Sequence, residues 1–287
     1  MEENAGESGP SLVEIARRHG TDKDWGHSYM PFYEALFRSR RDEPVVLLEI
    51  GVGGYQNPDC GGESLRTWKE YFPLGRVIGV DYFDKTKLQE DRVTIVQGDQ
   101  NDARFLRELV SRFAPFDFVV DDGSHVCRHV ITSFQALFPH LKPGGWYVVE
   151  DVATSYWPTF GGSYRLSNRR TTMGYFKNRA DRLNHAEFRW PKVRTSEIDV
   201  AVEEIRFRHE LVALMRGENS DRNRAVLQNA PFAQWVRQER PVHSLAFSLA
   251  HQWVPDTVIT KAQRFGPVAQ LISRFLPHEE RAQQILS

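Results

Sequence analysis

The sequence predicts an α/β protein with a doubly wound, mostly parallel sheet that carries helices on both faces. Between residues 44 and 152, apolar segments that fit strands alternate with amphipathic segments that fit helices. The strand segments are apolar along their whole length, as is typical of parallel strands covered on both sides. Acidic side chains follow these strands, and such sheets bind their ligands at the carboxyl ends of the strands.

The first predicted elements form a helical segment that precedes the sheet. The stretch SLVEIARRHG predicts a helix over 11–20, with Ser11 as N-cap, Glu14 completing a capping box and Gly20 ending the helix. A polar loop, GTDKDWGHSY, then runs into a second helix. Residues 1–10 are acidic and polar, and we expect them to form a disordered tail.

Strands and helices then alternate through the predicted sheet. Each strand is bounded by glycines or acidic residues, and the last helix of this region is stopped by Lys142, Pro143 and two glycines. The predicted strands are 44–54, 76–83, 93–102, 116–125 and 145–152, and the predicted helices are 64–72, 103–113 and 130–141.

The alternation breaks after Val152. Residues 153–186 are aromatic and basic, and they predict a long loop that enters a helix near 171–186. Loops of this length in compact domains are often lids or binding loops. Tyr164, Arg169 and Arg170 are therefore candidate substrate contacts, with an ordinary solvated loop as the alternative.

The rest of the chain predicts a hairpin and a helical extension. Strand patterns at 202–207 and 210–215 fit a hairpin at the edge of the sheet. We expect one domain over 11–220, followed by a mostly helical extension over 221–287. The extension is a candidate interface for a homo-oligomer.

The composition excludes several classes of protein. The 287 residues carry a formal net charge of −1, so no global field favours nucleic acid or an anionic membrane as a partner. No apolar run approaches the roughly 18 residues that span a bilayer, and the first residues have no apolar core of a signal peptide. Two cysteines define no disulfide framework. A cytoplasmic protein is the simplest expectation.

Three strand ends carry residues suited to a nucleotide-like cofactor. The first strand ends in EIGVGG, where Gly51 and Gly53 let the backbone approach a ligand closely. Asp81 ends the second strand and can accept bonds from both hydroxyls of a ribose. Asp99 and Gln100 follow the third strand, where they can bind the edge of an adenine. Each residue alone also fits an ordinary strand end.

At these motifs the sequence resembles the class I S-adenosylmethionine-dependent methyltransferases, which have a Rossmann-like sheet. The resemblance rests on EIGVGG, GVDYF, QGDQND and LKPGGWYVVED. A dinucleotide-binding dehydrogenase would have a stricter G-x-G-x-x-G that leads directly into a helix. More specifically, roughly residues 12–215 resemble the metal-dependent sugar O-methyltransferases of macrolide biosynthesis, the mycinamicin and tylosin type. This resemblance rests on the stretches GTDKDWGHSYMPFYE, GVGGYQNPDCGGESLRTWKEYFP, DDGSH and VVEDV.

The resemblance implies a site that combines a metal and a cofactor. It places Mg²⁺ on Asp122, Glu150 and Asp151 and makes His125 the general base. Which of Asp121, Asp122, Glu150 and Asp151 ligate the ion stays open. The segment before the first strand folds over the cofactor in this family. The candidate S-adenosylmethionine-binding residues are Ser28, Tyr29, Glu49, Gly51, Gly53, Asp81, Asp99, Gln100 and Asp121.

These residue types fit methyl transfer to a hydroxyl. Mg²⁺ prefers oxygen ligands and leaves positions that two adjacent sugar hydroxyls can fill. Histidine can accept the proton as the oxygen attacks the methyl group. The predicted function is therefore methylation of a sugar hydroxyl on a glycosylated natural product, a bacterial polysaccharide or a glycolipid. A catechol-type O-methyltransferase and a cofactor-binding protein without chemistry remain the alternatives.

Overall fold

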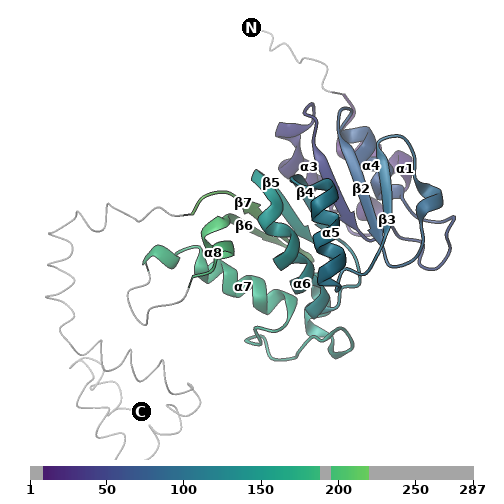
Figure 1. Ribbon diagram of the computed structural model, residues 1–287. Coiled ribbons are helices and arrows are strands. Elements are labelled where there is room, and N and C mark those ends of the chain that lie inside the picture. The colour runs from purple at the N-terminus through teal and green to yellow at the C-terminus, as the bar shows by residue number, and fades with distance from the viewer. Residues whose placement is uncertain (1–8, 188–194, 220–287) are drawn as a thin grey trace, which may run out of the picture. The chain divides into compact units, whose positions relative to one another are not determined.

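A computed structural model describes residues 9–187 and 195–219 of the chain. It contains a seven-stranded sheet in the order β3-β2-β1-β4-β5-β7-β6 (Figure 1). Strands β1 to β5 are parallel, while β7 and β6 are antiparallel. The predicted α/β fold class is thereby confirmed. The strands are β1 Val46–Ile50, β2 Arg76–Asp81, β3 Val93–Gln97, β4 Phe116–Asp121, β5 Leu141–Val149, β6 Val202–Arg208 and β7 Leu211–Arg216.

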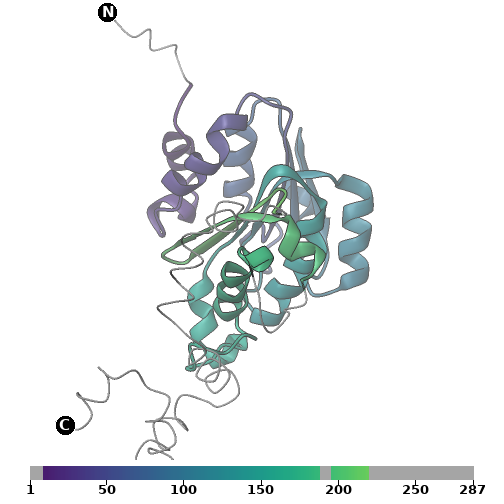
Figure 2. The same ribbon diagram turned by 90° about the vertical axis from the view of Figure 1, so that its left-hand side faces the viewer.

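Helices cover both faces of this sheet. Alternate residues of each strand point to opposite faces, so the strands contribute to two separate apolar cores. One core includes Leu47 and Phe118 with helices α1, α3 and α4, and the other includes Leu48 and Val119 with α5, α6 and α7. Figure 2 shows the N-terminal helices, drawn in purple, on one side of the strands. The helices are α1 Leu12–His19, α2 Asp22–Trp25, α3 Met30–Phe37, α4 Glu63–Tyr71, α5 Ala103–Phe113, α6 Cys127–Leu137, α7 Thr172–Arg182 and α8 Glu197–Ala201.

The predicted α1 helix and the predicted hairpin are confirmed, with the hairpin strands at Val202–Arg208 and Leu211–Arg216. The Ser11 side chain caps α1, Glu14 completes the capping box, and Gly20 ends the helix in the left-handed conformation at φ +75°. Strands β6 and β7 pair as an antiparallel hairpin, and β7 also pairs with β5. The hairpin therefore extends the parallel sheet next to β5.

Several predicted boundaries differ from the structure. The first four strands end earlier than predicted, at Ile50, Asp81, Gln97 and Asp121, and the helix predicted over 130–141 is Cys127–Leu137. The segment of Lys142 to Gly145 was expected to separate a helix from a strand, but β5 begins at Leu141 and includes it. A register irregularity between Phe116 and Phe118 on the neighbouring β4 accommodates this glycine-containing start. The predicted long loop contains short 3-10 turns at Val152–Tyr156 and Pro158–Phe160 before α7.

The topology places a crevice at the carboxyl ends of β1 and β4. Strand β1 is central and has β2 on one side and β4 on the other, so the chain's winding direction reverses there. Open α/β sheets bind ligands at such a reversal. Within the described residues, no helix is long and apolar enough to cross a membrane. The predicted extension over 221–287 and most of the predicted tail lie outside the described residues.

Candidate active site

The glycine-rich turn after β1 lies against the loop that follows β4. Gly51 has φ +97°, and a Cβ built on it would lie 2.1 Å from the carbonyl oxygen of Asp122. The Gly51 N–H donates to the Val80 carbonyl oxygen at 2.7 Å. Because only glycine allows both this φ and this approach, Gly51 sets how closely the ends of β1 and β4 can meet.

Asp81 is fixed at the end of β2 by two backbone donors. Its Oδ2 accepts a 2.9 Å hydrogen bond from the Val52 N–H, and its Oδ1 accepts one of 2.9 Å from the Phe83 N–H. The residue is only partly buried. Since each carboxylate oxygen has two lone pairs, Asp81 keeps acceptor capacity for ligand hydroxyls.

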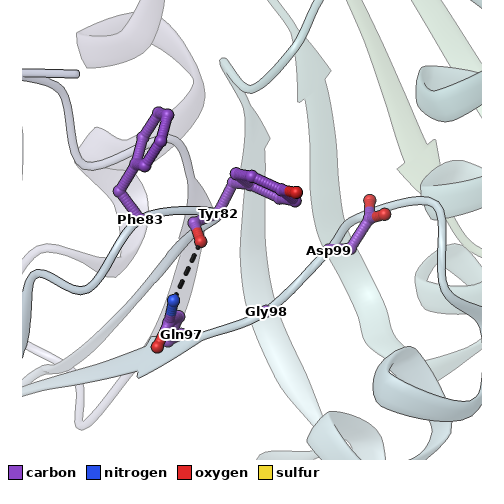
Figure 3. A pocket seen from close by; sticks show the side chains of 5 residues that line it. All are labelled: Tyr82, Phe83, Gln97, Gly98 and Asp99. Carbon is purple, nitrogen blue, oxygen red and sulfur yellow. Dashed lines mark hydrogen bonds between the residues drawn. The ribbon is translucent and has the colours of Figure 1, made fainter. Parts of the chain in front are cut away.

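Two pockets lie along this edge of the sheet. The larger, of about 430 Å³, is lined by Tyr82, Phe83, Gln97, Gly98 and Asp99 at the ends of β2 and β3. Figure 3 shows Tyr82 and Asp99 extending from these neighbouring strand ends, with the Gln97 amide donating to the Tyr82 carbonyl oxygen at 3.2 Å. Asp99 therefore lies where the sequence predicts it.

The smaller pocket lies between the glycine-rich turn and the N-terminal segment. Its volume is about 230 Å³. Because it brings together residues before β1, residues after β1 and Asp122 after β4, it joins the turn to the acidic residues of the site. Its lining consists of Gly20, Thr21, Asp22, Lys23, Gly51, Val52, Gly53, Gly54, Glu63, Ser64 and Asp122.

Asp122, His125 and Asp151 form a group that could hold a metal ion, here called the candidate metal group. One ligand atom of each lies within 4.8 Å of the others. His125 Nε2 lies 3.8 Å from Asp151 Oδ2. A second trio, His27, Asp151 and Glu210, meets the same distance limit and shares Asp151. The β4 and β5 ends therefore bring together two of the three predicted ligands and the predicted base.

Strained backbone conformations are concentrated around this group. Ser28, His125, Asp151 and Glu210 are non-glycine residues with φ between 53° and 60°. Such left-handed residues cost free energy and persist where the surrounding structure holds them, often at functional sites. The fold therefore holds His125 and Asp151 in conformations that the chain does not favour by itself.

Lys23 lies among the carboxylates, and sequence reasoning did not predict its role. Its ammonium lies 2.5 Å from Asp122 Oδ2, 2.9 Å from Glu150 Oε2 and 3.3 Å from Glu49 Oε1. Burial by itself lowers the pKa of Lys23, but the three carboxylates outweigh burial and raise it well above its usual value. Lys23 is therefore a buried cation in the site.

Glu150 is the buried member of the predicted ligand set. It is 3% exposed, and its Oε1 accepts from the Tyr33 hydroxyl while Oε2 accepts from Lys23. Burial and the Asp122 carboxylate raise the pKa of Glu150 well above its usual value, against the opposing effect of Lys23. Its assignment as a metal ligand stays a prediction.

Glu49 and Tyr29 also contact the charged residues of the site. Glu49 is fully buried and accepts a 2.7 Å bond from the Trp68 indole N–H. Burial raises the pKa of Glu49 to about 7, although Lys23 opposes the shift. The Tyr29 hydroxyl donates to Asp151 Oδ1 at 2.9 Å and lies 3.3 Å from Glu210 Oε2. Tyr29 thus reaches the candidate metal group directly.

Asp121 and Gln100 are turned toward protein partners. Asp121 is 1% exposed and accepts hydrogen bonds from Gln100, Ser133 and Tyr147. Gln100 also accepts a 2.6 Å bond from the Ser124 N–H through its Oε1. The two residues therefore support the turn that carries His125, and their predicted contacts with a cofactor stay predictions.

The remaining candidates lie in exposed positions. Tyr164 is 84% exposed, and Arg169 and Arg170 are exposed in the segment before α7. Ser28 is also exposed, and its carbonyl oxygen accepts a 3.1 Å bond from Arg208. The structure does not bring these four side chains into the candidate metal group, so their roles stay predictions.

Part of the sheet region is similar to a known protein family. Residues 57–152 match a family model described as a methyltransferase domain. The chain is similar to a methyltransferase domain over these residues. The matched stretch runs from the loop after the glycine-rich turn to Val152, and it includes Asp81, Asp122, His125 and Asp151.

Curated relatives extend the similarity of the methyltransferase domain. The chain is 52% identical over 180 residues to 8-demethyl-8-alpha-L-rhamnosyl tetracenomycin-C 2'-O-methyltransferase of Streptomyces olivaceus, covering 62% of this chain and 47% of that protein. It is 43% identical over 215 residues to mycinamicin VI 2''-O-methyltransferase of Micromonospora griseorubida, covering 74% and 54%. The chain thus spans about half the length of the curated relatives it matches.

The same similarity holds for solved structures. The structure of the MycE methyltransferase in complex with Mg, SAH and mycinamycin VI aligns with a TM-score of 0.69 at 42% identity, covering 75% of this chain and 57% of that one. A second crystal form of MycE with Mg and SAH aligns with a TM-score of 0.73. The predicted resemblance to macrolide sugar O-methyltransferases is confirmed.

Proposed function

We propose that this protein is an S-adenosylmethionine- and Mg²⁺-dependent O-methyltransferase that methylates a sugar hydroxyl of a glycosylated natural product. The observation that carries the proposal is the candidate metal group beside the pocket of the glycine-rich turn. Asp122 belongs to both, so a cofactor in the pocket and a cation on the carboxylates would be neighbours. This is the arrangement that metal-assisted methyl transfer requires.

The pockets fit the two ends of the proposed cofactor. Asp81 is next to both pockets. It accepts a hydrogen bond from Val52, which lines the smaller pocket, and it precedes Tyr82, which lines the larger. Gly51 and Gly53 would receive the amino-acid end, and Asp81 would accept bonds from the ribose hydroxyls. The exposed Tyr82 ring and the Asp99 carboxylate would face the adenine of the cofactor.

The donor set fits a hard divalent cation. Asp122 and Asp151 offer carboxylate oxygens, which Mg²⁺ prefers, and two carboxylates leave coordination positions for substrate oxygens. Glu150 is the proposed third ligand. Two vicinal sugar hydroxyls have the spacing to occupy adjacent positions on such a cation.

The proposed chemistry joins these parts. Bound S-adenosylmethionine supplies an electrophilic methyl group, and a bound divalent cation supplies positive charge beside the sugar hydroxyls. His125 accepts the hydroxyl proton on Nε2, the ring nitrogen that faces Asp151. Bound S-adenosylmethionine would supply the methyl carbon to which the sugar oxygen bonds, and S-adenosylhomocysteine would leave as the carbon–sulfur bond breaks. Asp151 stabilises the imidazolium that this leaves, and the protein otherwise aligns the reactants.

The named relatives favour a sugar hydroxyl over a catechol. They include the rhamnosyl tetracenomycin-C 2'-O-methyltransferase, demethylmacrocin O-methyltransferase of Streptomyces fradiae and mycinamicin VI 2''-O-methyltransferase. Their substrates by name are modified natural products, two of them named with a sugar position. The predicted cytoplasmic location and self-association stay predictions of this proposal.

A turnover assay tests the proposal. The full chain is incubated with S-adenosylmethionine and a panel of rhamnosylated and deoxysugar-bearing polyketides, with catechols as a second panel, and S-adenosylhomocysteine is quantified. We expect turnover on glycosides that stops with EDTA and returns with Mg²⁺. Asp122→Asn should lose this activity, whereas Asp59→Asn, which removes an exposed carboxylate paired with Lys87, should retain it.

Three results would contradict the proposal. Full turnover in excess chelator would exclude the metal. Turnover on catechols alone would exclude the sugar substrate. Tight cofactor binding without turnover on either panel would indicate a binding protein.

A further inference from the structure

We propose that Lys23 is a positioning residue of the site, whose ammonium holds the Asp122 and Glu150 carboxylates in the arrangement that a divalent cation needs. This inference rests on the proposed function, because it concerns the cation of the same site. Lys23 itself lies outside the ligand set, and it acts through the carboxylates it contacts.

The contacts of Lys23 converge on residues from three strand ends. Its side chain is 2% exposed, and its ammonium contacts Asp122 after β4, Glu150 after β5 and Glu49 in β1. The ammonium donates hydrogen bonds to Asp122 and Glu150, and its contact with Glu49 Oε1 is an ion pair without a hydrogen bond. Lys23 therefore ties the β1, β4 and β5 ends together through one atom.

The backbone and the neighbours of Lys23 fix this atom in place. Thr21 caps the short helix α2 by accepting from the Lys23 N–H at 3.4 Å, and the Lys23 carbonyl oxygen accepts from the Tyr29 N–H at 2.7 Å. Glu49 is in turn held by the Trp68 indole. The ammonium therefore has a fixed position rather than that of a mobile surface lysine.

A fixed ammonium affects the carboxylates in two ways. It offsets the negative charge of the three carboxylates, which would otherwise repel one another. It also occupies Asp122 Oδ2, so the carboxylate cannot rotate freely and its other oxygen keeps a set direction. Partners that orient metal ligands in this way typically change metal affinity 10–100-fold when removed.

A binding experiment with Mn²⁺ as the probe tests this role without turnover. The affinity is measured by electron paramagnetic resonance of free Mn²⁺ with the full chain. Since Lys23→Met leaves the buried Glu49 and Glu150 and the partly buried Asp122 without their cation and can prevent folding, the double variant Lys23→Met/Glu49→Gln is compared with Glu49→Gln. The pair differs only at Lys23, and the double variant carries no excess buried charge relative to wild type.

The chain offers a matched control in Lys85. This lysine is also fully buried, but its ammonium donates to the backbone carbonyl oxygens of Asn57 and Cys60. Lys85→Met should lower the melting temperature as the loss of any buried lysine would, while Mn²⁺ affinity stays within about threefold of wild type.

The expected result is Mn²⁺ binding that is about 10–100-fold weaker in the double variant than in Glu49→Gln. Equal or tighter binding in the folded double variant would overturn the role of Lys23, and so would an equal loss in Lys85→Met. If wild type itself binds no Mn²⁺, the proposed metal site fails and the role of Lys23 fails with it. If wild type binds Mn²⁺ but the variants contradict the role of Lys23, the proposed function is unaffected.

Discussion

Replacing Gly51 by alanine tests whether the close contact between β1 and the loop after β4 is a requirement of the fold. Two costs add. Holding alanine at φ +97° costs about 1–2 kcal/mol, the usual penalty for a left-handed residue with a Cβ. The new Cβ would lie 2.1 Å from the Asp122 carbonyl oxygen and 2.8 Å from its carbonyl carbon. Both atoms belong to the backbone, so the overlap costs roughly another 1–3 kcal/mol.

The structure provides a control that separates these two costs. Gly144 has φ +77°, and a Cβ built there has no atom within 4 Å. Gly144→Ala should therefore cost about 1–2 kcal/mol and Gly51→Ala about 2–5 kcal/mol, measured as the change in the free energy of unfolding in urea by circular dichroism. Equal losses in the two variants would refute the argument, because they would show that the contact with Asp122 contributes nothing.

Three further predictions follow from the site. Asp81→Ala should weaken S-adenosylhomocysteine binding by about 1.5–3 kcal/mol in calorimetric titration, the worth of hydrogen bonds to a charged group, and an unchanged Kd would show that Asp81 only ends a strand. His125→Ala should lower kcat by roughly 10²–10⁴ while cofactor affinity stays intact, and a variant that keeps the wild-type rate would place the base elsewhere. Burial raises the pKa of Glu49 to about 7 from an ordinary 4.5, so the folded protein holds a proton that the unfolded chain releases. This contribution to stability is present below about pH 4.5 and is lost as the pH rises through 7, on the order of 3 kcal/mol. Glu49→Gln should flatten that part of the curve of unfolding free energy against pH, and an unchanged curve would contradict the shift.

The strands and most helices could be predicted because their pattern is local. Apolar runs such as FDFVV are buried on both faces wherever a parallel sheet forms, and Ser11 with Glu14 marks a helix start within four residues. The start of β5 could not be predicted in the same way. Lys142 to Gly145 contains proline and two glycines, which favour a turn, but pairing with β4 draws this segment into the strand.

The role of Asp121 shows a signal that the sequence contains. Adjacent residues at a strand end point to opposite faces, so Asp121 and Asp122 cannot both face the same ligand. The structure follows this rule. Asp122 accepts a hydrogen bond from Lys23, whereas Asp121 accepts hydrogen bonds from Ser133 and Tyr147. Strict alternation therefore predicts that the two side chains have different partners, while the predicted cofactor contact of Asp121 stays a prediction.

Lys23 gives no comparable signal. It lies in the polar stretch GTDKDWGHSY, where a lysine between two aspartates is typical of a solvated loop. Lys23 becomes buried only when α2 packs over the ends of β1 and β4. Its partner Asp122 lies 99 positions away in the chain. Contacts of this kind depend on tertiary structure, and no periodicity within the segment indicates them.

The Glu210 contact has a consequence for the order in which the site can be assembled. Glu210 lies in the turn between β6 and β7, and it contacts the Tyr29 hydroxyl, while its carbonyl oxygen accepts from the Val152 N–H. During synthesis the parallel strands leave the ribosome first, and they can pair before the hairpin exists. The Tyr29 hydroxyl can contact Glu210 only once the hairpin has been synthesised, so the surroundings of Asp151 and Tyr29 are completed after β5 has left the ribosome.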